Sequence, residues 1–346
     1  MGQPGFFDLD QRHTSLNKMG DPLIMLKKKI PWEVFRPIVA NVHDKPRKSN
    51  AGRKPLDPVL MFKVLILQSL YNVSDEQIEY QIRDRLSFMR FLDLSLEDPV
   101  PDARTVWSYR QLLTDQGLLE PLFEQFNRSL IDQGYQAKKG QIIDASIVPV
   151  PKQRNTRTEN AAIKADHTPE GWDDKPAMKR QKDTNARWTK KHNQRHYGYK
   201  NHISVDRKHK LIRHFVVSDA AVHDSQMIDP VLDQHNTGAE VWADSAYRSE
   251  EIEQWLKAGR YKSQVHHKGK RGKALSEAKQ KVNQARSKVR ARVEHVFGYQ
   301  ENSMGGKFIR TIGINRARTK IALMNLTYNM MRFLLLERRT IGIIAA

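Results

Sequence analysis

The chain has 346 residues and carries 59 Lys and Arg against 39 Asp and Glu, which gives a net charge of +20. This length accommodates two domains or one elaborated domain, and the 39% share of hydrophobic residues is sufficient for a buried core. So strong a positive charge favours a polyanionic partner, most often a nucleic acid, although a merely basic soluble protein is the plainer alternative. Cysteine is absent, which excludes disulfide frameworks, thiolate metal sites and Cys nucleophiles.

Targeting and membrane signals are missing from the sequence. Residues 1–13 lack the basic-then-apolar pattern of a signal peptide. The most apolar late stretch, residues 321–336, contains Asn325, Asn329 and Arg332, so it predicts a buried helix rather than a membrane span. We therefore expect a cytoplasmic protein without a membrane partner.

The N-terminal part of the chain reads as helical. Residues 1–50 predict an N-terminal arm, and residues 51–136 predict an all-α domain. A polar run at 45–55 spans the boundary between them. Ser74 with Gln77 forms a capping-box pattern, and Asp102 is placed to cap the next helix. A third amphipathic helix is expected over 118–131. Short helices joined by tight turns are compatible with a DNA-reading helix-turn-helix bundle and equally with a structural or dimerising bundle.

From Gly140 onward the hydrophobic pattern predicts strands as well as helices, which indicates an α/β domain. Residues 141–150 predict a strand, 151–196 a long polar excursion, and 199–205 with 211–218 a hairpin. Alternating helices and strands follow, in the ranges 225–234, 241–244, 250–258, 261–265 and 273–298. This order is compatible with a ribonuclease H-like domain over 137–336, with a mixed sheet whose first three strands are antiparallel. Residues 337–346 are expected to be a C-terminal tail.

Three widely separated acids suggest a metal site. Asp144 and Asp244 each end or interrupt a short apolar run, as a strand carboxylate would, whereas Glu294 lies in a basic segment of helical period. Each acid alone is more often a cap, a surface group or, for Glu294, an ion-pair partner of Arg290 one turn earlier. As a set they provide the hard oxygen ligands that Mg²⁺ prefers, and two such ions about 4 Å apart can drive phosphoryl transfer. We therefore predict a two-metal Mg²⁺ site, with Mn²⁺ as a substitute.

The basic residues predict where a polyanion binds. Residues 260–292 hold twelve Lys and Arg and one acid, Glu277, which favours a phosphate-contacting surface over a merely solvated helix face. The predicted contacts on this segment are Arg286, Lys288, Arg290 and Arg292. Lys200 is expected near the reacting phosphate. Trp188 and Trp172, in the excursion, are suited to stack on unpaired bases, although anchoring a loop to the core is an equally good reading.

Several blocks of the sequence together resemble a known family. IIDASIVPVPKQRNTRTENAAIK resembles a first-Asp block, ADSAYRSEE a second-Asp block and RVEHVFGYQE a Glu block. RHYGYKNHISVD, VSDAAVHDSQMI and IGINRARTKIALMNLTYNMMR are similar to the intervening and C-terminal blocks, and residues 52–113 to the N-terminal domain. In this order they resemble the DDE transposases of bacterial insertion sequences, in the insertion-sequence-five family.

The resemblance implies that Asp144, Asp244 and Glu294 are the catalytic triad and bind divalent metal. It implies cleavage of double-stranded DNA at terminal inverted repeats and strand transfer into target DNA. Because two ends must be joined, we expect a homodimer in the DNA complex. A related branch carries a Tyr-x-x-Arg-x-x-x-Glu-x-x-x-x-x-x-Lys signature, from which this chain departs with Ser287 and Glu301. Two alternatives remain: a catalytically silent DNA-binding regulator derived from such an enzyme, and a structure-specific nuclease on the same fold.

Overall fold

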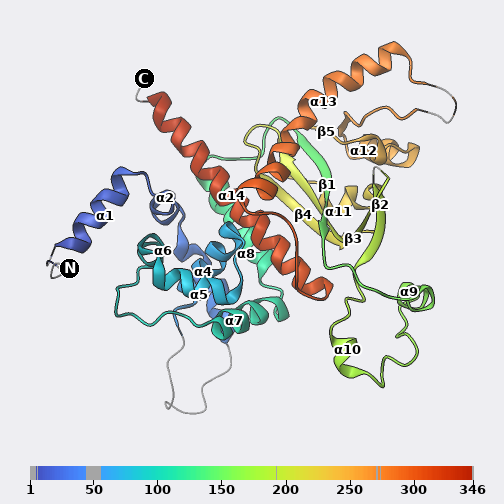
Figure 1. Ribbon diagram of the computed structural model, residues 1–346. Helices are drawn as coiled ribbons and strands as arrows, with labels where there is room; N and C mark the ends of the chain where they lie inside the picture. The colour runs from blue at the N-terminus through green and yellow to red at the C-terminus, as the bar shows by residue number, and fades with distance from the viewer. Residues whose placement is uncertain are drawn as a thin grey trace. The chain divides into compact units, whose positions relative to one another are not determined.

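The computed structural model describes residues 5, 7–43, 56–191, 193–269, 272 and 274–344 (Figure 1). The chain divides into two compact units, a helical unit of Met1–Gly134 with Leu323–Ala346, and a sheet unit of Tyr135–Ala322. The whole of the predicted polar run at 45–55 lies outside the described residues, as do Lys270, Arg271 and Lys273 of the basic segment and the last two residues of the expected tail. Among the residues that the structure describes, every helix is too short or too polar to span a bilayer.

The helical unit is built from short helices joined by tight turns. Its α-helices are α1 (Asp8–Lys18), α2 (Pro22–Lys29), α3 (Arg36–Val39), α4 (Pro58–Tyr71), α5 (Asp75–Asp84), α6 (Leu86–Leu92), α7 (Ala103–Asp115) and α8 (Leu119–Asp132). The predicted caps form, since Ser74 accepts a hydrogen bond from the Gln77 amide and Asp102 accepts one from the Thr105 amide. Residues expected as an arm instead form helices, because their apolar side chains Trp32 and Phe35 are buried against Phe62.

The sheet unit contains six strands and the helices that cover them. The strands are β1 (Gln141–Pro149), β2 (Arg187–Lys191), β3 (Gln194–Asp206), β4 (Ile212–Asp219), β5 (Glu240–Trp242) and β6 (Lys262–Ser263). The α-helices are α9 (Arg157–Lys164), α10 (Pro176–Arg180), α11 (Ile228–Val231), α12 (Glu250–Ala258) and α13 (Glu277–Gly298). The last helix, α14 (Ile314–Ile344), begins in the sheet unit and ends in the helical unit.

The sheet is mixed, as predicted, and the ribonuclease H-like α/β class is confirmed. β3 pairs antiparallel with β1, β2 and β4, whereas β1–β5 and β5–β6 are parallel. Ile143 of β1 packs with Val241 of β5 and with α11 and α12 on one face. Because side chains alternate along a strand, Asp144 points to the opposite face, where α13 contacts β1. The sheet therefore lies between α13 on one side and α11 with α12 on the other (Figure 1).

The polar excursion is more ordered than its composition indicates. Thr156 and Glu159 form a reciprocal capping box at the start of α9. The Trp172 indole is buried and donates a hydrogen bond of 2.8 Å to Glu159. The excursion ends in β2, which pairs with the first residues of β3. The local cap and the buried indole supply the order that hydrophobic periodicity does not reveal.

A buried histidine makes the stability of the sheet unit dependent on pH. His202 of β3 is fully buried, its Nε2 lies 2.8 Å from Ser218 Oγ, and burial lowers its pKa from 6.5 to about 4. In the unfolded chain the His202 imidazole is protonated near pH 6.5, whereas in the folded chain it is protonated only near pH 4. The free energy of unfolding should therefore fall, by up to about 3 kcal/mol, as the pH is lowered through that window.

Denaturant titrations at several pH values check this expectation. His202→Gln should show a shallower decline between pH 6.5 and 4 than wild type, because it has no proton to take up. His235→Gln, which removes an exposed histidine, is the matched control and should keep the wild-type decline. Identical pH profiles for His202→Gln and wild type would contradict the assignment.

Candidate active site

The two strand carboxylates are brought together by the register of β1 and β5. Gln141 pairs with Val241 and Ile142 with Trp242, an offset of 100 residues in both pairs. Asp144 and Asp244 each follow the second of these pairs by two residues, and the charge of Asp244 acts on the Asp144 carboxyl. β5 ends before Asp244, which caps a short 3-10 turn by accepting a hydrogen bond of 2.7 Å from the Ala246 amide.

Asp144 is the most constrained carboxylate of the site. Its Oδ2 accepts a hydrogen bond of 2.9 Å from Arg290 Nη2, and its Oδ1 accepts one of 2.8 Å from the Ala145 amide. Burial raises the pKa of Asp144, and the charge of Asp244 acts in the same direction while Arg290 opposes both. A second negative charge beside a desolvated carboxylate favours a cation at this position.

Sequence reasoning missed Tyr247, which lies three residues after Asp244 and is fully buried. Its hydroxyl has no hydrogen-bond partner within the described part of the chain, and the same holds for Nε of Arg290. Burial raises the pKa of Tyr247 well above 10, and the charges of Asp144, Asp224 and Asp244 add to the shift. A buried polar group without a partner is costly, so these atoms fit a site that receives a polar or charged ligand.

Two further missed residues surround the site. Asp224 precedes α11 and forms an ion pair of 2.8 Å with Lys200. His266 follows β6, and its amide donates to the Ala243 carbonyl at 3.1 Å. Burial lowers the pKa of His266, with Arg290 acting in the same direction and Asp244 opposing it. No sequence motif marks either residue, because both come near the carboxylates only through contacts made in the folded sheet.

Glu294 is not brought to the two aspartates. It is exposed on α13, and among the described residues no group of three or more His, Asp or Glu side chains is arranged to hold a metal ion. Its neighbour one turn earlier, Arg290, is the α13 residue that contacts Asp144. Glu294 therefore lies about one helical turn, or 5.4 Å along α13, from a residue that touches the site.

Most of the predicted DNA-contacting cations have partners within the sheet unit. Lys200 donates to the Val222 carbonyl at 2.7 Å as well as to Asp224. Arg286 donates to the Val265 carbonyl at 2.6 Å, and Arg292 to the Arg207 carbonyl at 2.7 Å. Lys288, by contrast, is exposed. The arginines thus fasten α13 to the rest of the unit.

The two tryptophans of the excursion differ in exposure. Trp172 anchors the excursion from a buried position, whereas Trp188 is 41% exposed and packs against Tyr197 with ring centroids 5.1 Å apart. Trp188 also lines a pocket of about 520 Å³ with Lys164 and Arg187. Of the two roles open to these side chains, Trp172 has the anchoring one, and Trp188 keeps an open indole face.

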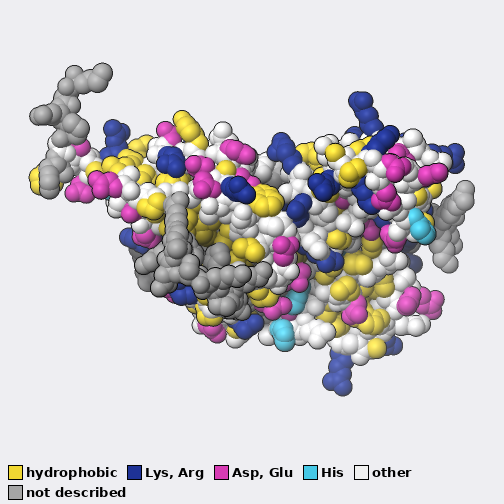
Figure 2. All heavy atoms as spheres, turned by 90° about the horizontal axis from the view of Figure 1, so that it is seen from below, with side chains coloured by type: hydrophobic (Ala, Val, Ile, Leu, Met, Phe, Trp, Pro, Cys, Tyr) yellow, Lys and Arg dark blue, Asp and Glu magenta, His cyan; other side chains and the backbone are white. Residues whose placement is uncertain are grey.

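The positive charge is concentrated in the sheet unit. Residues 135–322 hold 38 Lys and Arg against 20 Asp and Glu, a net charge of +18, whereas the rest of the chain holds 21 against 19. Figure 2 shows that on one face of the molecule the basic side chains are spread among acidic and hydrophobic ones and do not form one continuous patch. A polyanion would therefore be drawn mainly to the unit that carries the carboxylates.

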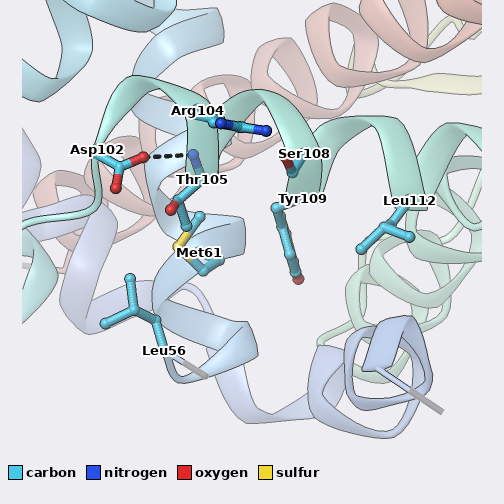
Figure 3. A pocket seen from close by; sticks show the side chains of 8 residues that line it. All are labelled: Leu56, Met61, Asp102, Arg104, Thr105, Ser108, Tyr109 and Leu112. Atoms are coloured by element: carbon cyan, nitrogen blue, oxygen red, sulfur yellow. Dashed lines mark hydrogen bonds between the residues drawn. The ribbon is translucent and has the colours of Figure 1, made fainter. Parts of the chain in front are cut away.

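A second pocket, of about 310 Å³, lies in the helical unit between the start of α4 and α7 (Figure 3). Two of its polar groups already serve the fold, because Asp102 caps α7 and the Tyr109 hydroxyl donates to the Pro58 carbonyl at 2.9 Å. Leu56, Met61 and Leu112 supply its apolar lining. Asp102 and Tyr109 in this pocket thus have structural roles at the start of α7 and between α7 and α4.

Comparison with protein families accounts for both units. The family described as "Transposase DDE domain" matches residues 135–330, and that described as "Transposase domain (DUF772)" matches residues 11–112. No solved structure matches the chain. The insertion-sequence-five assignment stays a prediction that is consistent with these matches, and the DDE domain implies dependence on a divalent metal. The chain belongs to the DDE transposases, enzymes that bind DNA and cleave and transfer its phosphodiester bonds.

Proposed function

We propose that this transposase cuts at the terminal inverted repeats of an insertion sequence and joins the ends to target DNA, with Asp144, Asp244 and Glu294 as the ligands of two Mg²⁺ ions. The proposal is carried by the parallel pairing of β1 with β5, which ends two residues before each aspartate, together with the effect of the Asp244 charge on Asp144. Carboxylate oxygens are the ligands that Mg²⁺ prefers, and Mn²⁺ is expected to substitute. Such ions, when bound, stabilise the charge that develops on the attacking and leaving oxygens of an in-line displacement.

The side chains of the site have distinct parts in this proposal. Asp144 on β1 and Asp244 in the turn that follows β5 would bind the cations. Glu294 completes the set by a change of side-chain rotamer or a small shift of α13. Arg290 then exchanges its contact with Asp144 for a DNA phosphate or for Glu294, which lies one turn away on the same helix. The protonated Tyr247 hydroxyl is available as a hydrogen-bond donor beside the carboxylates.

DNA is held, in this proposal, by cations on α13 and by an aromatic side chain of the excursion. Lys288 contacts phosphates directly, and Arg286, Arg290 and Arg292 use the donors that their intramolecular bonds leave over. Lys200 approaches the scissile phosphate. Trp188 stacks on an unpaired base near the element end. Two ends must be joined in one event, which supports a homodimer, and the resemblance to bacterial elements supports action in the cytoplasm.

We expect Asp244→Asn to abolish cleavage while leaving the affinity for an element-end duplex nearly unchanged. The amide keeps an oxygen that can cap the turn at Ala246, so the fold is preserved, but the negative charge that binds metal is lost. The single-turnover cleavage rate should fall by at least about a hundred-fold. An unfolded variant that no longer binds DNA would show instead that Asp244 is structural.

Binding to an element-end duplex should weaken steeply with salt. Each phosphate that the protein neutralises contributes a slope of about −0.9 to a plot of log K against log salt concentration. Lys288→Gln should make the slope shallower by about one, because it removes one phosphate contact. Lys257→Gln, at an exposed position on α12, is the matched control and should keep the wild-type slope. If the affinity of the wild type for DNA did not change with salt concentration, the proposal that α13 binds DNA would be contradicted.

A strand-transfer assay tests the proposal as a whole. Purified protein is mixed with labelled DNA carrying the ends that flank its gene, a supercoiled target, and either Mg²⁺ or EDTA. Joined products that require metal and are absent with Asp144→Asn and Glu294→Gln are the expected result. Cleavage without joining would identify a nuclease, and binding by folded protein without cleavage would identify a regulator.

A further inference from the structure

The segment after α13 returns to the strand that carries Asp144. α13 continues into a π-helical turn, Tyr299–Ser303, and Gly305 and Gly306 follow with φ angles of +74° and +99°. This glycine pair reverses the chain at little steric cost. Beyond it the Ile309 amide donates a hydrogen bond of 3.0 Å to the Pro149 carbonyl at the end of β1.

The returning segment lies on the edge of β1 that β5 leaves uncovered. The Val150 amide donates to Tyr197 of β3, so in a trans peptide the Pro149 carbonyl points away from β3. β5 occupies that other edge only at Gln141 and Ile142. The segment therefore meets β1 at Pro149, on the side of the strand away from β3.

Lys307, in this segment, reaches the face of β1 that carries Asp144. Its Nζ donates to Ser146 Oγ at 2.8 Å, and Ser146 shares a face with Asp144 because the two are two residues apart on one strand. The same ammonium lies 5.0 Å from the centroid of the Phe297 ring. Phe297 is seven residues, or about two helical turns, after Arg290, and Glu294 lies between them on that side of α13. Lys307 is thus placed between β1 and the helix stripe of Glu294.

The charge of Lys307 is only weakly compensated. Its carboxylate partner, Glu301, lies 3.3 Å away and has a side chain that is 57% exposed, whereas the Lys307 side chain is 10% exposed. Ser146 contributes a neutral hydroxyl, and burial lowers the pKa of Lys307. Arg290, by comparison, faces the carboxylate of Asp144, whose side chain is 17% exposed. An anion that approaches β1 would be a better partner for Lys307 than the solvated Glu301.

We propose that Lys307 binds a phosphate of the DNA strand next to the scissile bond, on the far side of Glu294 from Arg290. The proposal rests on the function proposed above and adds a phosphate-binding residue to the same site. A purely structural role is separable, since the Ile309–Pro149 backbone bond secures the segment without the Lys307 side chain.

The test combines Lys307→Gln and Lys307→Arg with end duplexes in which single phosphates around the cleavage position are replaced by neutral methylphosphonates. Affinity is measured in EDTA and single-turnover cleavage in Mg²⁺. Lys208→Gln is the matched control, because Lys208 is exposed in the β3–β4 turn at the opposite end of β1. Thermal melting confirms that each variant is folded.

One methylphosphonate position should weaken wild-type binding and slow cleavage about ten-fold or more, yet have no further effect on Lys307→Gln. Lys307→Arg should restore most of the loss, because it restores the charge. Fully additive effects at every phosphate, or a Lys307→Gln variant that behaves as Lys208→Gln, would overturn the proposal. A wild type that binds but never cleaves would refute the proposed function, while the affinities in EDTA would still decide the role of Lys307.

Discussion

The parallel pairing of β1 with β5 is the constraint on which the site depends. Only two residue pairs define it, and a slip of one residue would set Asp144 beside Ala243 or Ser245. Gly140 permits the close approach of the two strands, because its φ is +79° and a Cβ there would lie 2.4 Å from the Glu240 carbonyl oxygen. The position of the two carboxylates proposed as metal ligands thus depends on a short ladder and one glycine just before β1.

α13 supplies the rest of the site, and its own attachment explains why its arginines are buried in part. Arg286 and Arg292 are six residues apart and bond backbone carbonyls on either side of Arg290, which holds that residue against Asp144. A guanidinium has five N–H donors, so these intramolecular bonds do not exhaust its capacity for phosphates. The same side chains can therefore fasten the helix and contribute to the +18 charge of the sheet unit.

Sequence reasoning found what local pattern encodes and missed what long-range contacts decide. β1, the β3–β4 hairpin and the caps at Ser74 and Asp102 followed from periodicity and turn chemistry. The capping box at Thr156 was equally local but was obscured by the polarity around it. The exposure of Trp172 and Trp188 could not be predicted, because it depends on which residues of the folded excursion each indole packs against. Tyr247 likewise gained significance only once β1 and β5 were paired.

The charges around Asp144 bear on how Glu294, the proposed third ligand, could join the two aspartates. The negative charge of Asp244 acts on Asp144, whose pKa burial already raises, and Arg290 opposes both effects at Asp144. A divalent cation bound by both aspartates would take over this role and lower the gain from the Arg290 contact. Since Glu294 is four residues from Arg290 on one helix face, displacement of the guanidinium and approach of Glu294 concern the same turn of α13. In the proposed site, metal binding by the aspartates and the approach of Glu294 would therefore be coupled through a single turn of α13.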